Sequence, residues 1–273
     1  MDLSQVPEEY LEFRDVFSKQ HIKHFPEHCP YDLSIQMEEG KLLLLGPIYS
    51  LSALKLKILR EFIKENLHTR FICSFHSSCG APVLFVKKKD SSLYLYINYQ
   101  GLNKITSKDK YLIPLVSDLL DAPKKARIYT KIDLCSAYHL VCIAEGDKWK
   151  TTFRTKYSSY EWLVMLFGLA NTPSVFQQLI NEIFVDLLDI HIVVYLDNIL
   201  IYSNNLVEHK KHVREVLKCL RKNRLYASPN KYTFYQEHIE FLGFVLGPRG
   251  IQMDIEKVWT IQEWPLSQCI KNI

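Results

Sequence analysis

Two aspartates in strand-like surroundings are the residues of this chain best suited to chemistry. Asp197 lies in residues 192–203, Ile-Val-Val-Tyr-Leu-Asp-Asn-Ile-Leu-Ile-Tyr-Ser, where two apolar runs flank a predicted Asp197-Asn198 turn, and Asp133 ends the apolar run 127–133. A carboxylate among buried strands is costly unless it binds a partner, usually a cation. Two carboxylates on adjacent strands can share a pair of Mg²⁺ ions in phosphoryl transfer. On residue types alone a simple turn is the better explanation, because Asp and Asn both tolerate the left-handed conformation.

The composition indicates an intracellular globular protein. The chain has 273 residues, of which 48% are hydrophobic and 23% charged, so one large or two small domains with a substantial core are expected. The net charge of +4 is compatible with nucleic-acid binding without being diagnostic. Seven cysteines, an odd number without a secretory signal, indicate a reducing compartment. The apolar runs are too short to span a membrane, so no membrane partner is expected.

Hydrophobic periodicity predicts an α+β fold. Helices are expected over residues 7–19, 51–66, 114–122, 172–188, 206–223 and from 254 onward. Strands are expected over residues 82–88, 93–99, 127–133, 150–154, 160–165, 190–196, 199–203 and 239–246. Because no βαβ unit repeats, the helices are expected to pack on antiparallel sheets.

Five motifs occur in one order along the chain: residues 82–103, 133–138, 167–177, 195–198 and 241–243. In this order and spacing they closely resemble the reverse transcriptase of gypsy-type LTR retrotransposons, and the resemblance covers nearly the whole chain. Each motif alone is weakly specific, whereas five in register are highly specific.

The resemblance implies a right-hand polymerase with fingers, palm and a partial thumb. It implies the following division: a protease-to-polymerase connecting segment (1–45), fingers (46–108 and 141–171), palm (109–140 and 172–243) and the truncated start of the thumb or connection (244–273). An intact element would add a flanking protease, ribonuclease H and integrase.

The resemblance also implies roles for individual residues. Asp133 and Asp197 would bind the metal, and Asn198 would take the place of a third catalytic carboxylate. Nucleotide contacts are implied for Lys88, Leu134, Tyr138, Phe167, Gly168 and Gln177. A primer grip is implied for Phe241, Leu242 and Gly243. Tyr138 would exclude the 2′-hydroxyl of ribonucleotides.

Each of these roles has a plain structural alternative. Tyr138 is otherwise a core tyrosine, and residues 87–89 are otherwise a solvated basic turn. Pro173 is explained by helix capping after Thr172, and residues 241–243 form an ordinary strand-to-turn sequence without the other motifs.

The chain departs from the family pattern at charged positions. Asn198 replaces Asp and loses one negative charge beside the expected cations. Tyr94 and Gln100 stand where Arg is expected to meet the substrate or template, and a phenol cannot replace a bidentate cation. Cys135 and Cys142 also stand where Arg is usual. The expected activity is therefore weak or absent.

Some possible metal ligands lie outside these motifs. Cys73, His76 and Cys79 have ligand-like spacing without a fourth partner, and zinc is not expected there. A second cluster comprises His21, His24, His28 and Cys29, for which solvated side chains are expected. Glu208, His209 and His212 are expected on a solvated helix face.

The expected activity is the RNA- or DNA-templated addition of dNMP to a primer 3′-OH with Mg²⁺, or Mn²⁺ in its place. The expected partners are a primed RNA or DNA template and dNTP, and the expected location is the cytoplasm, a virus-like particle or the nucleus. A non-catalytic nucleic-acid-binding remnant is the alternative from another class. A palm-type nucleotide cyclase is disfavoured by residues 82–103.

Overall fold

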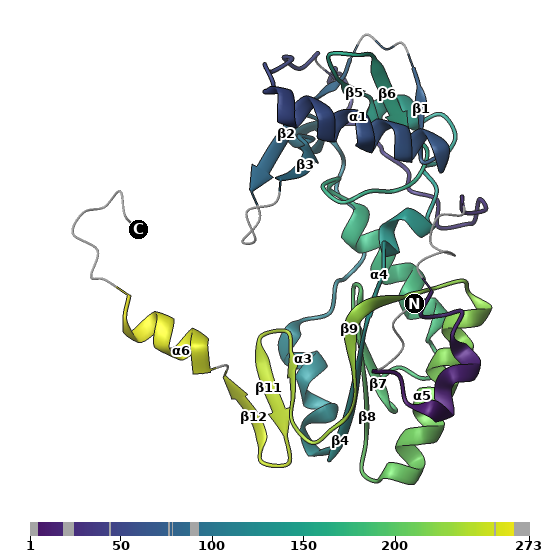
Figure 1. Ribbon diagram of the computed structural model, residues 1–273, viewed down its shortest axis with the longest axis vertical. Helices are drawn as coiled ribbons and strands as arrows, with labels where there is room; N and C mark the ends of the chain where they lie inside the picture. Colours follow the sequence, from purple (N-terminus) through teal and green to yellow (C-terminus); the bar gives the residue numbers. More distant parts are fainter. Residues whose placement is uncertain are drawn as a thin grey trace. The chain divides into compact units, whose positions relative to one another are not determined.

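The chain divides into two units, each assembled from segments that are distant in sequence (Figure 1). The computed structural model describes residues 5–18, 25–43, 45–75, 77, 79–87, 93–253 and 255–264. Unit 1 is built from Met1–Phe17, Pro114–Leu134 and Phe184–Ile273, and unit 2 from Ser18–Ile113 and Cys135–Ile183.

Unit 1 is centred on a four-stranded sheet in the order β7-β8-β4-β9. The strands are β4 (Ile128–Leu134), β7 (Ile192–Tyr195), β8 (Asn198–Ser203) and β9 (Ala227–Gln236), and every pairing is antiparallel. β-Branched and aromatic residues dominate β4, β7 and β8, as expected for strands with packed faces.

One face of this sheet is covered by helix α5 (Leu206–Lys222). Its buried positions follow the helical period: Val213, Val216, Leu217 and Leu220. The side chain of Asn205 caps the helix by accepting a hydrogen bond from the Glu208 N–H at 2.9 Å. A second apolar cluster includes Tyr129, Leu200 and Phe241 and packs with α3 (Val116–Asp121).

The remaining elements of unit 1 are short. They are η1 (Glu8–Phe13), η3 (Pro123–Lys125), β10 (Ile239–Phe241), β11 (Phe244–Gly247), β12 (Gly250–Met253) and α6 (Ile255–Gln262). Strands β10, β11 and β12 form an antiparallel three-stranded sheet.

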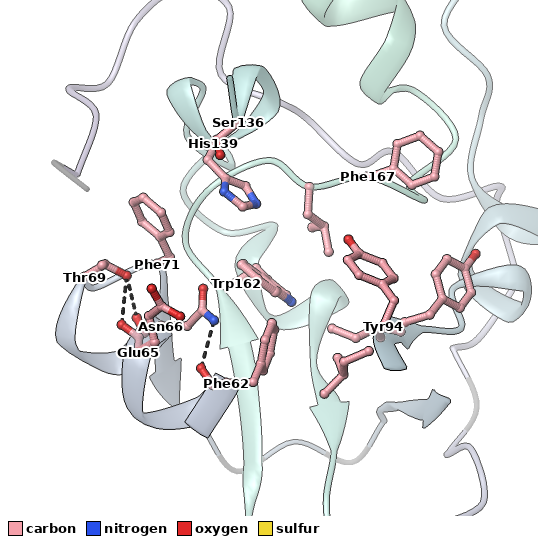
Figure 2. Close-up of a pocket in the computed structure, with 14 residues that line it drawn as sticks. Phe62, Glu65, Asn66, Thr69, Phe71, Tyr94, Ser136, His139, Trp162 and Phe167 are labelled. Atoms are coloured by element: carbon pink, nitrogen blue, oxygen red, sulfur yellow. Dashed lines mark hydrogen bonds between the residues drawn. The ribbon is translucent and has the colours of Figure 1, made fainter. Parts of the chain in front are cut away.

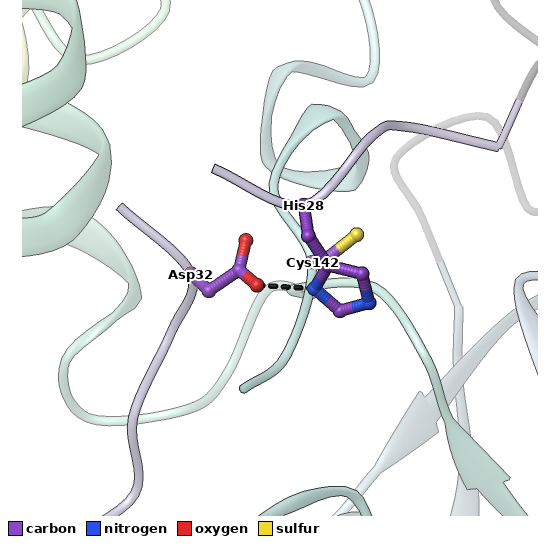
Figure 3. Close-up of side chains that lie close together, drawn as sticks. All are labelled: His28, Asp32 and Cys142. Atoms are coloured by element: carbon purple, nitrogen blue, oxygen red, sulfur yellow. Dashed lines mark hydrogen bonds and ion pairs between the residues drawn. The ribbon is translucent and has the colours of Figure 1, made fainter. Parts of the chain in front are cut away.

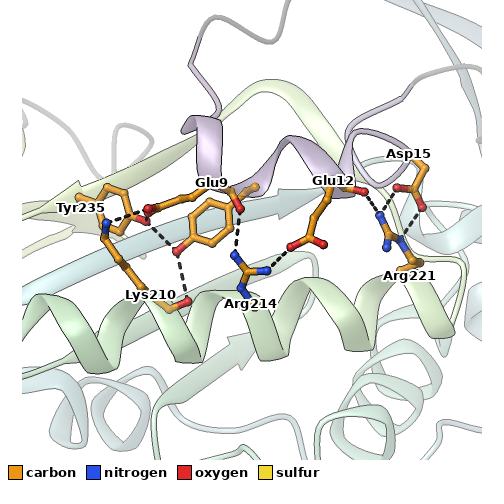
Figure 4. A network of polar contacts seen from close by, with 8 residues as sticks. Glu9, Glu12, Asp15, Lys210, Arg214, Arg221 and Tyr235 are labelled. Atoms are coloured by element: carbon orange, nitrogen blue, oxygen red, sulfur yellow. Dashed lines mark hydrogen bonds and ion pairs between the residues drawn. The ribbon is translucent and has the colours of Figure 1, made fainter.

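The N-terminal 3₁₀ helix η1 lies along α5 and is held by ion pairs (Figure 4). Lys210 Nζ is 2.7 Å from Glu9 Oε2, and Arg221 Nη2 is 2.5 Å from Asp15 Oδ1. Exposed ion pairs contribute little individually, so most of the docking energy comes from burial. The buried aromatic side chains of η1 are Tyr10 and Phe13.

His209 on α5 was expected on a solvated helix face, and this expectation is wrong. Its side chain is fully buried. Its Nε2 lies 2.8 Å from Thr130 Oγ1 and its Nδ1 2.9 Å from Ser203 Oγ. Burial lowers the pKa of His209 to about 4, so this ring is neutral at physiological pH.

Unit 2 contains a five-stranded sheet in the order β1-β6-β5-β2-β3. Its strands are β1 (Ile72–Ser74), β2 (Ala81–Lys87), β3 (Leu93–Ile97), β5 (Phe153–Arg154) and β6 (Ser159–Trp162). Among the described strand pairs of this sheet, β2–β5 is parallel and the others are antiparallel. Its helices are α1 (Ala53–His68), α2 (Gln100–Ile105), η4 (Ala137–Leu140), η5 (Lys148–Thr151) and α4 (Thr172–Ile183).

The predicted α+β class is confirmed, with differences at particular elements. The predicted helix 172–188 ends at Ile183, and the predicted strand 239–246 is the β10–β11 hairpin. Thr172 is the first residue of α4 rather than its predicted N-cap, and its hydroxyl donates to the Leu166 carbonyl at 2.8 Å. Among the described residues, no helix is both long and apolar enough to cross a membrane.

Candidate active site

Strand pairing brings Asp133 and Asn198 together in unit 1. Asp133 near the end of β4 is paired directly with Asn198 at the start of β8, so both side chains project from the same face of the sheet. The Leu134 N–H donates to the Asp197 carbonyl at 2.7 Å. Asp133, Leu134 and Asp197 therefore lie with Asn198 at one end of the β4–β8 strand pair.

The turn between β7 and β8 lies one residue earlier than predicted. Tyr195 pairs with Asn198, so the two-residue loop is Leu196-Asp197 rather than Asp197-Asn198. The left-handed residue is Leu196, with φ 54°. Such a conformation costs a non-glycine residue roughly 1 kcal/mol or more and persists where the surroundings impose it, often at functional sites. The turn preferences of Asp and Asn therefore do not account for the carboxylate at Asp197.

The described side chains compensate the charge of the two carboxylates only in part. Asp133 Oδ1 is buried without a hydrogen-bond partner among the described residues, and Asp133 Oδ2 lies 3.4 Å from Lys231 Nζ. Asp197 Oδ1 accepts a hydrogen bond from Asn198 Nδ2 at 3.1 Å. Burial, and next the charge of Asp133, raise the pKa of Asp197.

This arrangement fits a divalent cation. Asp133 Oδ1, buried without a partner among the described residues, and the Asp197 carboxylate of raised pKa are both stabilised by added positive charge. Oxygen donors are also the ligands that Mg²⁺ prefers. Asn198 uses its amide N–H group on Asp197, which leaves its carbonyl oxygen as a further neutral donor. Asp133 and Asp197 are thus the residues that would hold the ion.

The raised pKa of Asp197 predicts a pH-dependent stability in metal-free buffer. Because the folded pKa lies above the ordinary value of 3.8, the ionised side chain is disfavoured by folding. The protonated Asp197 side chain stabilises the fold fully below pH 3.8, and this contribution is lost as the pH rises through the pKa of the folded state. Asp197→Asn should therefore be more stable than the parent chain at neutral pH, and this advantage should shrink as the pH falls toward 3.8. Urea unfolding across this range would measure it, and an advantage independent of pH would contradict the assignment.

Sequence reasoning missed Lys231. This residue lies on β9, and its exposed ammonium group faces Asp133 Oδ2. The strand was not predicted because Ser228-Pro229-Asn230 is typical of a turn, although the alternation in residues 231–236 was a usable signal.

Two of the predicted nucleotide residues, Tyr138 and Phe167, lie in an aromatic cluster of unit 2. Tyr138 lies in η4, and its ring centroid is 5.2 Å from that of Phe176, edge to face, and 6.2 Å from that of Phe167. Phe167 is 66% exposed. Tyr138 is therefore partly packed against the core residue Phe176 and adjoins an exposed aromatic surface, which suits contact with a flat ligand.

Gly168 and Gln177 have different surroundings. Gly168 has φ 103°, which favours glycine, and its carbonyl accepts from Asn103 Nδ2 at 2.8 Å. Gln177 is fully buried, and its Nε2 donates to Asn181 Oδ1 at 2.8 Å. Gln177 therefore acts within the packing of α4 in this structure, and its contact with template or nucleotide stays a prediction.

The remaining predicted residues also have defined places. Leu134 is buried, so its backbone rather than its side chain reaches the Asp197 loop. Phe241 belongs to the apolar core of unit 1, whereas Leu242 (φ 51°) and Gly243 (φ 82°) form the left-handed turn between β10 and β11. Lys88 lies outside the described residues.

A cavity of about 310 Å³ in unit 2 contains Tyr94 and Phe167 in its lining (Figure 2). The ring of His139 stacks on Trp162 with centroids 5.7 Å apart, and burial lowers the pKa of His139 to about 4. No Lys or Arg occurs among the described residues that line this cavity. Tyr94, which stands where an Arg is expected, therefore faces a space without the cation that a phosphate would need.

Comparison with known proteins decides the family. Residues 86–246, more than half of the chain, match the model of the family "Reverse transcriptase (RNA-dependent DNA polymerase)". The chain belongs to the reverse transcriptase family. The match includes both aspartates and Asn198, and reverse transcriptases generally depend on divalent metal ions.

Retrotransposon polyproteins are similar over most of the chain. The Transposon Tf2-7 and Tf2-8 polyproteins of Schizosaccharomyces pombe are each 31% identical over 263 residues, which cover 95% of this chain. The chain spans only 20% of the length of these relatives. It is thus a reverse transcriptase domain of the kind found in retrotransposon polyproteins.

Solved structures support the fold. The foamy viral protease-reverse transcriptase in complex with dsDNA is similar with a TM-score of 0.85 and 18% identity, covering 98% of this chain and 56% of that one. The same type of protein in complex with an RNA/DNA hybrid gives a TM-score of 0.82 and 18% identity, covering 97% of this chain and 35% of that one.

Proposed function

We propose that this chain is the RNA-directed DNA polymerase domain of a gypsy-type LTR retrotransposon, with weakened activity. The observation that carries the proposal is the end of the β4–β8 strand pair, where Asp133 and Asp197 lie close together and Asp133 Oδ1 is buried without a hydrogen-bond partner among the described residues. The substrates are a primed RNA or DNA template and dNTP. The ranges proposed for fingers, palm and thumb are those that the resemblance implies. The intracellular location also stays a prediction.

Asp133 and Asp197 would bind Mg²⁺, or Mn²⁺ in its place, which supplies activation of the primer 3′-hydroxyl and neutralisation of the triphosphate charge. The chain's own groups keep the two carboxylates in position. The Leu134 N–H holds the Asp197 backbone, and the amide of Asn198 orients the Asp197 carboxylate. Lys231 lies beside Asp133 Oδ2 and lowers the negative potential before the ion arrives.

Two features support weak rather than full activity. Asn198 contributes a carbonyl oxygen but no charge beside Asp133, which leaves two carboxylates for the cations. Tyr94 is 49% exposed on β3, and its phenol cannot form the bidentate contact that an Arg makes with phosphate. Both changes reduce the electrostatic stabilisation of the transferred phosphoryl group.

The test compares extension with binding. A labelled primer annealed to RNA or DNA is incubated with dNTP and Mg²⁺ or Mn²⁺, and duplex binding is measured in parallel by anisotropy at several salt concentrations. Slow extension together with salt-sensitive binding is expected. Binding without extension under either ion would instead establish the non-catalytic remnant.

Replacement of Tyr138 by alanine should relax sugar selection. Removing the ring makes room for a 2′-hydroxyl, so the preference for dNTP over rNTP should fall by at least about tenfold. Single-nucleotide extension with each triphosphate measures the ratio, and circular dichroism verifies the fold. Tyr138→Phe retains the ring and serves as the matched control. An unchanged ratio in folded Tyr138→Ala would refute the steric role.

A further inference from the structure

Three side chains of different chemistry converge in unit 2 (Figure 3). His28 and Asp32 come from the N-terminal segment, and Cys142 follows η4 more than a hundred residues later. One ligand atom from each lies within 4.8 Å of the others. His28 Nδ1 contacts Asp32 Oδ2 directly.

The backbone fixes the segment that carries two of these residues. The Asp32 N–H donates to the Cys29 carbonyl at 3.1 Å, which closes a turn with Pro30 at its second position. The Cys29 N–H in turn donates to Asp32 Oδ1 at 3.0 Å. The Leu33 N–H donates to the Cys142 carbonyl at 2.9 Å, so the turn is tied directly to the third ligand.

The geometry and donor set suit a borderline-soft divalent ion. Zinc bonds of about 2.0–2.3 Å to sulfur, nitrogen and oxygen place tetrahedral ligands about 3.3–3.8 Å apart. The observed grouping within 4.8 Å needs only small side-chain adjustments to reach that spacing. A thiol, an imidazole and a carboxylate together favour Zn²⁺ over Mg²⁺, which takes oxygen ligands.

We propose that His28, Asp32 and Cys142 form a zinc site that joins the N-terminal segment to the region after η4. A water molecule supplies the fourth ligand. The site is separate from the polymerase function, and its role is structural, because zinc bound here cross-links two segments distant in sequence.

Cys142 must lose its proton to bind the ion. It is fully buried, so its thiolate would need a cation beside it. Without a metal the thiol stays protonated and donates to the Pro26 carbonyl at 3.5 Å. Zinc binding releases the Cys142 proton to solvent and leaves a thiolate–metal bond. His28 keeps 43% of its side chain exposed, which provides an entry path.

Cobalt spectroscopy distinguishes this site from the paired aspartates. The full chain is stripped with chelator under reducing conditions and titrated with Co²⁺, then with Zn²⁺. A thiolate-to-cobalt charge-transfer band that saturates near one equivalent and disappears on adding zinc is expected. Asp133 and Asp197 give no such band because they carry no sulfur.

Variants identify the ligands. Cys142→Arg offers Asp32 a cation in place of the metal and should remove the band, and His28→Ala should weaken Co²⁺ binding by at least about tenfold. Cys73→Ser, a half-buried thiol that donates to Glu161 instead, is the matched control and should keep the band. Because His28 is substantially exposed, His28→Ala should fold even if Cys142→Arg does not. Absence of the band in the parent chain, or its survival in His28→Ala with unchanged affinity, would overturn the proposal.

Discussion

Replacing Asp133 by asparagine should abolish primer extension and at the same time stabilise the metal-free chain. Asp133 carries the buried oxygen without a partner among the described residues, and its charge contributes to the raised pKa of Asp197. Removing one of two neighbouring negative charges lowers their repulsion. The ion pair that is lost spans 3.4 Å and has an exposed Lys231 side chain, so it contributes little to stability. We expect a gain of about 1 kcal/mol in the free energy of unfolding.

The same substitution removes a ligand from the cation site. The extension rate should fall at least a hundredfold, the order of magnitude seen when one preorganised electrostatic group is removed from an active site. Asp121→Asn is the matched control, because Asp121 also lies in unit 1 but only pairs with Lys124 at the surface. Extension time courses and urea unfolding without metal measure the two effects. A variant that loses stability as well as activity would indicate a structural role for Asp133.

Replacing Asn198 by aspartate should lower the stability of the metal-free chain and raise the rate of primer extension, the reverse of the effects expected for Asp133→Asn. The new carboxylate would face Asp133 across the strand pair and would no longer donate to Asp197. Without a divalent ion, three neighbouring carboxylates repel one another, and the free energy of unfolding should fall by about 1 kcal/mol. With Mg²⁺ present the added charge strengthens the cation site, and extension should rise about tenfold, which corresponds to about 1.4 kcal/mol of transition-state stabilisation.

A matched substitution separates the site effect from a general charge effect. Asn205 caps α5, and aspartate caps a helix equally well, so Asn205→Asp adds the same charge to unit 1 with little change in stability. Its extension rate should equal that of the parent chain. An Asn198→Asp variant whose stability and extension do not respond to Mg²⁺ would show that residue 198 is not part of a cation site.

Much of this architecture could be predicted because local patterns agree with the final packing. The period of apolar residues in α5 and the apolar runs of β4, β7 and β8 identified the elements that position the aspartates, and the same period identified α1 and α4 in unit 2. The resemblance to reverse transcriptases then linked Asp133 to Asp197, which no local pattern can do. The family match is consistent with that link.

The errors have identifiable physical causes. The helix predicted to residue 188 stops at Ile183, although Phe184 continues the apolar period, because Phe184 is buried in non-helical chain and periodicity cannot distinguish the two. The β10–β11 hairpin escaped prediction because its turn uses a left-handed Leu242, a conformation that Leu rarely adopts. The proximity of Cys142 to Asp32 could not be predicted from sequence, because it depends on the tertiary contact between two segments that are distant along the chain.

The most direct test of the central claim is one Mg²⁺ titration of single-nucleotide extension with three proteins: the parent chain, Asp133→Asn and Asn198→Asp. If Asp133 and Asp197 hold the ion beside Asn198, the parent chain extends slowly with a saturable Mg²⁺ dependence. Asn198→Asp then reaches half-maximal rate at a lower Mg²⁺ concentration, and Asp133→Asn remains inactive throughout. Three superimposable titration curves would contradict the account.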